Sequence, residues 1–196
     1  MTTTLSDSYK LFGQRLQGCI ECDLCELPVN QPDGAKILGT GDPSSQVFFV
    51  AQNPSIFRTK GARVLDRGDR AGRLFCEAFR TKGVRRESMI VTHLVKCSTA
   101  KNEIPSDATV ETCAKTWLEN EIALLDPKII VTVGRLPMHY FGAAEHQEID
   151  WRGRRVLAIK HPAYYVKQEW THLDYADQEL EKLVDAGVFD LLTKEK

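Results

Sequence analysis

Four short apolar runs, separated by stretches with helical periodicity, constrain most strongly how this chain folds. Runs rich in β-branched and aromatic residues are typical of parallel strands that are buried on both faces. They cover residues 47–51, 89–95, 128–133 and 155–159. Apolar residues at helical spacing lie between and after them, over residues 71–82, 106–125, 135–141 and 174–186. The alternation predicts an α/β fold, a three-layer α/β/α sandwich around a four-stranded, mainly parallel sheet.

Length and composition bound the class of protein. A chain of 196 residues with 42% hydrophobic and 27% charged residues is long enough for one globular domain and short for two. We therefore expect a single domain over residues 1–196. No stretch approaches the roughly 20 apolar residues that cross a bilayer, and the polar N-terminus lacks the apolar segment of a secretory signal. These features predict a cytoplasmic protein without a membrane partner.

The charges are unevenly distributed, although the net charge is −1. Residues 58–87 hold ten Lys or Arg against four Asp or Glu, and residues 169–196 hold three against eight. Such a chain can turn a basic face toward a polyanion while it stays nearly neutral overall. The alternative is a solvated helix whose arginines point outward.

The expected strand ends predict where a ligand binds. In parallel α/β sheets, ligands bind beyond the carboxyl ends of the strands. Four segments directly follow an expected strand: 52–55, 96–102, 134–135 and 161–165. We therefore expect them to converge on one cleft.

Six cysteines in a reducing compartment are more typical of thiols or metal ligands than of disulfides. Four of them have the spacing of a metal site: Cys22, Cys25, Cys97 and Cys113. Such a set fits either zinc or a [4Fe–4S] cluster, and the spacing does not choose between them. The N-terminal cysteine-rich segment, about 19–28, would bind the metal, and Cys19 could compete as a ligand. Cys76 has no partner in the pattern, so we expect it to pack in the core or on the surface.

Several motifs together resemble one known family. They are Cys22-Asp-Leu-Cys25, Val95-Lys96-Cys97 followed by a proline-containing loop and Cys113, and His161-Pro-Ala-Tyr-Tyr. In this order, they resemble the uracil-DNA glycosylase superfamily, and most closely its iron–sulfur branch, family 4. The resemblance implies a [4Fe–4S] cluster held by the four cysteines, with zinc as the less favoured occupant. It also implies a hydrolase, a monofunctional DNA glycosylase that removes uracil or another altered base and leaves an abasic site for base excision repair.

The resemblance assigns the chemistry to two motifs. Gln52-Asn53-Pro54-Ser55 stands where iron–sulfur members usually carry Gly-Glu-Ala-Pro-Gly, so Gln52 occupies the place of their Glu. Hydrolysis of the glycosidic bond needs a placed water and a donor that stabilises the departing base anion. We expect the amide oxygen of Asn53 to orient the water and His161 to donate to the base.

This chain also departs from the family pattern. His93 replaces the Asn that reads the edge of uracil, and an imidazole offers a differently shaped donor and acceptor. The family string whose Phe stacks on the base is missing from residues 61–72, so either Phe57 stacks on the base or no residue does. Members that trap uracil covalently carry a His in a long insertion after the second strand. Here the loop over residues 97–106 is short and contains no His. We therefore do not expect covalent trapping.

The expected partner is DNA with a flipped-out base. The residues expected to contact DNA are Ser55, Lys96, Lys101, Ala163 and Tyr164, besides the basic stretch 58–87. No nucleotide cofactor is expected, and the protein is expected to be a monomer.

Two other functions are compatible with these residues. The altered base-reading position favours, as one alternative, a glycosylase for hypermodified phage bases, which would act in antiviral defence. The other is a catalytically weak module that only binds DNA and whose fold is held together by the metal site. Strand nicking by alkali after incubation would indicate an enzyme, whereas a gel shift without nicking would indicate a binder.

Overall fold

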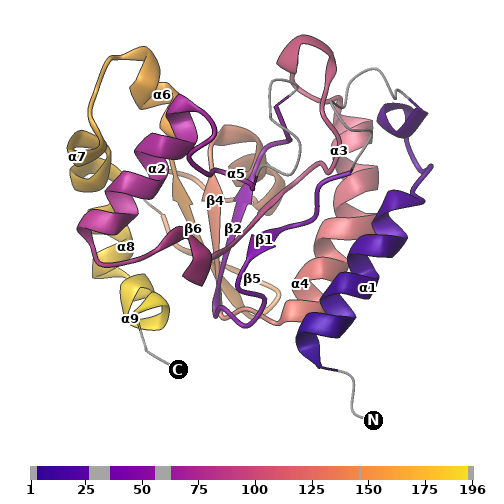
Figure 1. Cartoon of the computed structure of the whole chain (residues 1–196), viewed down its shortest axis with the longest axis horizontal. Coiled ribbons are helices and arrows are strands. Elements are labelled where there is room, and N and C mark those ends of the chain that lie inside the picture. Colours follow the sequence, from indigo (N-terminus) through magenta and orange to yellow (C-terminus); the bar gives the residue numbers. More distant parts are fainter. Residues whose placement is uncertain (1–3, 27–35, 56–62, 146, 194–196) are drawn as a thin grey trace.

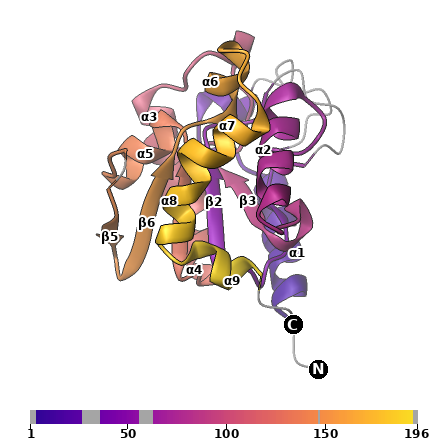
Figure 2. The ribbon, with the colours of Figure 1, turned by 90° about the vertical axis from the view of Figure 1, so that its left-hand side faces the viewer.

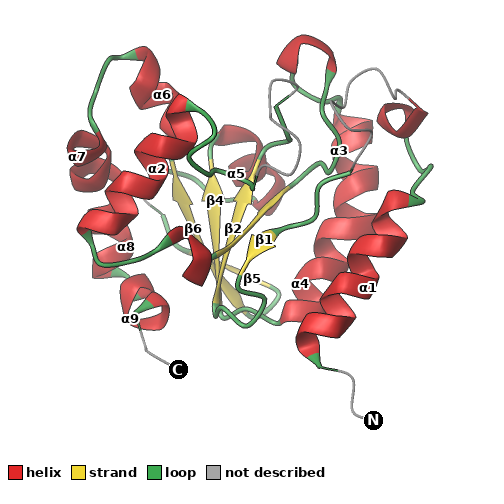
Figure 3. Cartoon of the chain, in the orientation of Figure 1, coloured by secondary structure: helices red, strands yellow, loops and turns green. Residues whose placement is uncertain are grey.

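The fold is a mixed sheet between two layers of helices (Figures 1 and 3). The computed structural model describes residues 4–26, 36–55, 63–145 and 147–193. The sheet has six strands in the order β1-β3-β2-β4-β6-β5. The strands are β1 Thr40–Gly41, β2 Val47–Ala51, β3 Ile90–His93, β4 Ile129–Val133, β5 Ile149–Trp151 and β6 Arg154–Ile159. This confirms the predicted three-layer α/β/α fold.

The four central strands are the four that the apolar runs predict, and they are parallel to one another. The strand count of four is too low, because β1 and β5 add a short antiparallel strand at each edge. These edge strands have two and three residues and are partly exposed. They therefore lack the buried apolar run by which the central strands are recognised.

Helices cover both faces of the sheet (Figures 1 and 2). One layer contains α2 Arg70–Thr81, α6 Pro162–Lys167, α7 His172–Tyr175, α8 Glu181–Asp185 and α9 Val188–Leu192. The other contains α1 Leu5–Gln17, α3 Asp107–Cys113, α4 Glu119–Leu125 and α5 Arg135–Phe141. The expected long helices after Ser106 and before Gly187 each form, and each contains a π-helical turn, Ala114–Leu118 and Ala176–Leu180. Short 3-10 turns lie at Asp23–Glu26, Arg86–Ser88 and Ala100–Asn102.

Alternating side chains of the central strands fill two cores. On β2, Val47, Phe49 and Ala51 face the layer that contains α2, whereas Phe48 and Val50 face the layer that contains α1. All five are buried, because helices cover the sheet on both sides. The sheet therefore provides a rigid platform from which the loops after its strands project.

The carboxyl ends of the central strands meet at one edge of the sheet, and the described ends of the chain lie toward the opposite edge (Figure 1). The loops after β2, β3, β4 and β6 therefore share the edge at which ligands bind in such sheets. Among the helices of the described residues, none is long and apolar enough to cross a membrane.

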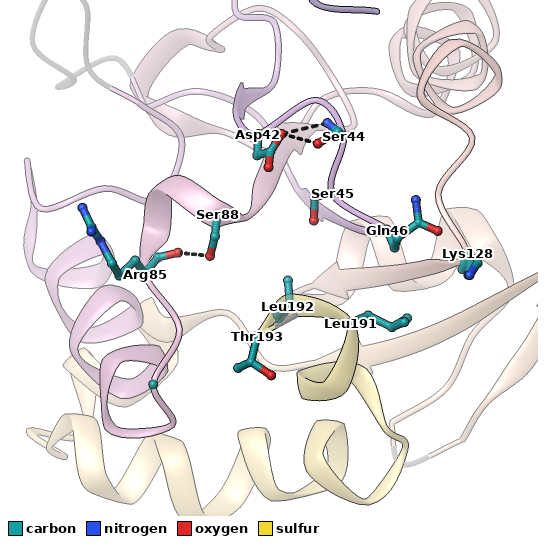
Figure 4. A pocket seen from close by; sticks show the side chains of 11 residues that line it. Asp42, Ser44, Ser45, Gln46, Arg85, Ser88, Lys128, Leu191, Leu192 and Thr193 are labelled. Carbon is teal, nitrogen blue, oxygen red and sulfur yellow. Dashed lines mark hydrogen bonds between the residues drawn. The ribbon is translucent and has the colours of Figure 1, made fainter. Parts of the chain in front are cut away.

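A cavity of about 700 Å³ lies at the opposite edge of the sheet (Figure 4). Its wall includes Gln46 and Lys128, which directly precede β2 and β4, and Leu191, Leu192 and Thr193 at the C-terminal end of α9. Asp42 accepts hydrogen bonds from the backbone and the hydroxyl of Ser44 in this wall. None of the residues that the sequence assigns to chemistry lines this cavity.

Candidate active site and cysteine cluster

A second cavity, of about 140 Å³, lies where the loops after the central strands meet. Asn53 and Ser55 line it from the loop after β2, His93 from the end of β3, and His161 from the loop after β6. Its volume equals roughly that of five liquid waters, which suits a small planar ring. Residues of two of the four expected segments, 52–55 and 161–165, thus converge at one place, and His93 joins them from within the expected strand 89–95 because β3 ends at His93.

His161 is held in one orientation by the start of helix α6. It is the N-cap residue, and its Nδ1 accepts a hydrogen bond from the backbone N–H of Ala163 at 3.1 Å. In the neutral ring the proton is therefore assigned to Nε2, which makes that nitrogen the donor. Burial lowers the pKa of His161 to about 4, although the nearby charge of Asp69 acts in the opposite direction. The imidazole is thus a neutral hydrogen-bond donor at pH 7.

Gly134 explains why the loop after β4 belongs to the same site. Its φ is +97°, and a Cβ on this residue would lie 3.0 Å from Cβ of His161. The backbone N–H of Gly134 also donates to the carbonyl of Ile159 at 2.8 Å. A glycine lets the two strand ends approach closely, so Gly134 supports the position of His161.

Asn53 is half-buried and oriented by its neighbours. Its Oδ1 accepts a hydrogen bond from Nε2 of Gln52 at 2.9 Å, while its Nδ2 donates to the carbonyl of Pro54 and, at 3.4 Å, to Oγ1 of Thr99. An amide oxygen has two lone pairs, so one is left for a water. Gln52, which was expected to contact the substrate, donates its amide N–H to Asn53 and is not among the described lining residues; its contact with the substrate stays a prediction.

The wall around the expected base differs from the family pattern, as the sequence indicates. His93 is buried and lines the cavity, which is the location expected for a group that reads the base edge. Phe57, the candidate for stacking, lies outside the described residues. Val64 and Leu65 line the cavity from the segment that lacks the family's Phe, together with Arg63, Asp69 and Ala71, so aliphatic and charged side chains share this part of the wall.

The residues expected to contact DNA have different surroundings. Ser55 lines the cavity, Tyr164 is 48% exposed next to His161, and Lys101 is exposed in the loop after β3. Ala163 is half-buried and uses its backbone N–H on His161.

Lys96 corrects the sequence expectation, because its ammonium is inside the protein. The residue is 1% exposed and its Nζ lies 2.5 Å from Oε2 of the fully buried Glu121. Thr92 and the carbonyl of His93 accept two further hydrogen bonds from Nζ, and Tyr9 donates to the other oxygen of Glu121. Lys96 therefore cannot contact a phosphate. It joins β3, α1 and α4 through a buried ion pair instead.

Part of the basic stretch is also engaged within the protein. Arg63 pairs with Glu87 at 3.3 Å, and Lys82 pairs with Glu181 of the acidic C-terminal part. Arg70 is exposed at the start of α2. The prediction that this stretch faces DNA stays a prediction.

Cysteines from three distant segments line a third, small cavity. Cys22 follows α1, Cys97 follows β3, and Cys113 ends α3, and all three line this cavity together with Cys19. The backbone N–H of Lys96 donates to Sγ of Cys113 at 3.3 Å. The side chain of Cys25 lies outside the described atoms. Among the side chains that the structure describes, no three potential ligands stand close enough to hold one metal ion, but the donor set is the one that suits zinc or iron–sulfur binding.

The remaining cysteine behaves as expected. Cys76 is buried on α2, and its Sγ contacts the carbonyl of Leu65 at 3.5 Å. Burial, with a smaller effect from Asp66, raises the pKa of the Cys76 thiol to about 11. A protonated, buried thiol of this kind is a packing residue rather than a reactive group.

One residue in the wall of the cavity was missed at the level of sequence. Asp69 lines the cavity next to His161 and is the N-cap of α2. Its position directly before a helical pattern indicates a helix cap. The sequence does not show that the folded chain also places this residue near the loop after β6.

Comparisons with known proteins agree with this architecture. The family model of the uracil DNA glycosylase superfamily matches residues 38–183. A type-4 uracil-DNA glycosylase of Thermotoga maritima is 26% identical over 162 residues, which cover 78% of this chain and 82% of the relative. The type-4 enzyme of Archaeoglobus fulgidus is 26% identical over 76% of this chain and 79% of its own. That of Pyrobaculum aerophilum is 30% identical over 62% and 60%.

The matched region contains all six strands and both histidines of the cavity. The match begins at residue 38, after the N-terminal cysteines Cys19, Cys22 and Cys25. On the match of its family model, the chain belongs to the uracil DNA glycosylase superfamily.

Proposed function

We propose that this protein is an iron–sulfur uracil-DNA glycosylase, which hydrolyses the bond between uracil and deoxyribose and leaves an abasic site. The relatives named type-4 uracil-DNA glycosylase support this reaction class. The single observation that carries the proposal is the neutral His161 at the strand-end cavity, with Nδ1 engaged and Nε2 left as donor.

The expected chemistry follows from charge development in the transition state. As the C1′–N bond breaks, negative charge grows on the base and positive charge on the sugar. A fixed, neutral N–H donor beside the base oxygen stabilises the anion without first giving up a proton. Asn53 holds a water for attack on C1′, and Gln52 keeps the amide of Asn53 in place. The target base reaches the cavity by flipping out of the DNA stack.

The proposed metal site holds a [4Fe–4S] cluster with a structural role. Cys22, Cys97 and Cys113 are three of its ligands, and a cluster there would tie the loop after β3 to α3 and to the segment after α1. We propose Cys25 as the fourth ligand, as the resemblance implies, with Cys19 as the competing candidate. Cys19 lines the cavity with Cys22, Cys97 and Cys113, and its Sγ accepts a hydrogen bond from the indole of Trp117.

The remaining proposed properties concern the environment of the protein. We propose that it works on DNA as a cytoplasmic monomer without a nucleotide cofactor. The exposed Tyr164, Lys101 and Arg70 are the groups we propose to contact the DNA.

A panel of oligonucleotides tests the proposal. Each contains uracil, thymine or a bulky modified pyrimidine at one position, in single and double strands, and abasic sites are read by alkaline cleavage. We expect cleavage at uracil that is lost in His161→Ala. Cleavage only at the bulky base would favour the defence enzyme, and a gel shift without cleavage at any base would favour a DNA-binding module.

A further inference from the structure

The proposed active site lacks one element that its chemistry needs. Asn53 is uncharged and His161 is neutral at pH 7, so neither group offsets the positive charge that develops on the sugar. An amide oxygen is also too weak a base to take a proton from the attacking water. A carboxylate that faces the same cavity would meet both needs.

Asp69 is the one carboxylate among the described residues that line this cavity. It approaches from the loop before α2, whereas Asn53 and His161 come from the loops after β2 and β6. Its negative charge already acts on the imidazole of His161, where it favours the protonated ring and so raises the pKa against the larger effect of burial. The carboxylate is therefore close to the reacting groups.

The carboxylate of Asp69 is fixed by its role as a helix cap. Its Oδ1 accepts a hydrogen bond from the backbone N–H of Gly72 at 2.7 Å. Among the described residues no donor is bonded to Oδ2, so one carboxylate oxygen is available to a ligand. A group held by the backbone of a helix is better fixed than one on a mobile loop.

The loop that carries Asp69 is built as a rigid support. The guanidinium of the buried Arg86 donates to the carbonyl of Val64 at 3.0 Å and to Oγ1 of Thr40 at 2.9 Å. The next residue, Leu65, adopts a φ of +46°, which is strained for a side chain of this size. Strained backbone that persists in a well-bonded segment is a feature of functional sites.

Gly72 is the second residue that fixes the loop, at its contact with the first turn of α2. A Cβ on Gly72 would lie 1.7 Å from the carbonyl oxygen of Asp66, so only glycine lets the first turn of α2 pack onto the loop. The same glycine donates the hydrogen bond that fixes Asp69. The loop thus sets the position of the carboxylate relative to the cavity.

We infer that Asp69 is a second catalytic group of the proposed glycosylase, whose carboxylate stabilises the cationic sugar and takes the proton of the attacking water. The inference rests on the proposed function. The C1′–N bond breaks, and its electron pair leaves with the base, whose oxygen accepts the Nε2–H bond of His161. The water oxygen bonds to C1′ while its proton moves to Asp69 and then through solvent to the base anion. One water is consumed, and the products are the neutral base and the abasic sugar.

The variant Asp69→Asn isolates the charge, because Asn caps helices as well as Asp does. On uracil-containing duplex, its single-turnover rate should fall about 10²–10⁴-fold, the usual contribution of general acid–base catalysis. Its affinity for the DNA should be equal or higher, since a negative charge near phosphates is removed. Asp66→Asn is the matched control, because Asp66 caps Arg67 in the same loop and is not among the residues that line the cavity. Its rate should stay within about threefold of wild type.

A double variant distinguishes a catalytic charge from a structural cap. In Asn53→Asp/Asp69→Asn, the carboxylate moves from the loop before α2 to the loop after β2, which lines the same cavity, and the rate should recover at least about tenfold over Asp69→Asn. A wild-type rate in Asp69→Asn would overturn the inference, and so would a slow Asp69→Asn that the second substitution does not improve. If wild-type protein releases no uracil, the proposed function fails, which is a different result from a fast Asp69→Asn.

Discussion

The protonation state of His161 leads to a quantitative prediction about the pH dependence of base release. With a pKa of about 4, about 97% of the imidazole is neutral at pH 5.5, whereas an ordinary histidine would be only about 10% neutral there. The single-turnover rate should therefore stay nearly constant from about pH 8 to about pH 5.5. Replacement by Ala removes the donor and should lower the rate about 10²–10³-fold at every pH in this range.

The assay is single-turnover release of uracil from a duplex oligonucleotide, with enzyme in saturating excess so that binding does not limit the rate. His139→Ala is the matched control, because His139 is an exposed histidine on α5 that is not among the residues that line the cavity. A roughly tenfold fall of the wild-type rate between pH 7 and 5.5, centred near an ordinary histidine pKa, would refute the assignment of a neutral donor.

The same pKa affects stability with a definite sign. The unfolded chain binds a proton on this histidine near pH 6.5, whereas the folded protein binds it only near pH 4. The free energy of unfolding therefore falls as the pH drops through this window, by at most about 1.4 kcal/mol per pH unit. In urea unfolding, His161→Ala should lose less stability than wild type between these two values.

The remaining predictions concern the metal site, the buried ion pair and the base-reading position. Anaerobically purified protein should absorb broadly near ~400 nm, and Cys25→Ser should lose iron while Cys76→Ser retains it; iron loss in Cys19→Ser but not in Cys25→Ser would contradict the choice of the fourth ligand. Lys96→Met should lower the free energy of unfolding by about 3–5 kcal/mol, because it leaves Glu121 buried and unpaired, and an effect as small as that of Lys101→Met would contradict the ion pair. His93→Asn should raise the rate on uracil relative to a modified base; unchanged ratios would show that His93 does not read the base.

The sequence predicts the centre of this fold better than its edges. The four parallel strands are recognised because each is a continuous apolar run that is buried on both faces. Helix α1 has no such signal, since only Tyr9 and Leu16 are buried on it and Gly13 interrupts it. That glycine lets the helix approach Leu38, whose Cδ2 would lie 2.9 Å from an added Cβ, and only the folded structure shows this contact.

The candidate site was predictable to the extent that it follows the strand ends. Asn53 and His161 follow predicted strands, so the rule for parallel sheets brings them together. His93 lies within the predicted strand 89–95 and reaches the cavity because β3 ends at that residue. Lys96 was misjudged because its charge is visible in the sequence, whereas its partner Glu121 reaches it only through tertiary packing. Asp69 was missed because the sequence shows only its local role as a helix cap, whereas tertiary packing places it in the cavity wall.

The central claim is tested most directly by the intact mass of a DNA strand that contains one uracil, measured after incubation with the purified protein. Hydrolysis predicts that the mass decreases by that of uracil and increases by that of one water, with the strand unbroken and free uracil released in equal amount. An unchanged strand, a strand cleaved without alkali, or a covalent adduct with the protein would each contradict the account.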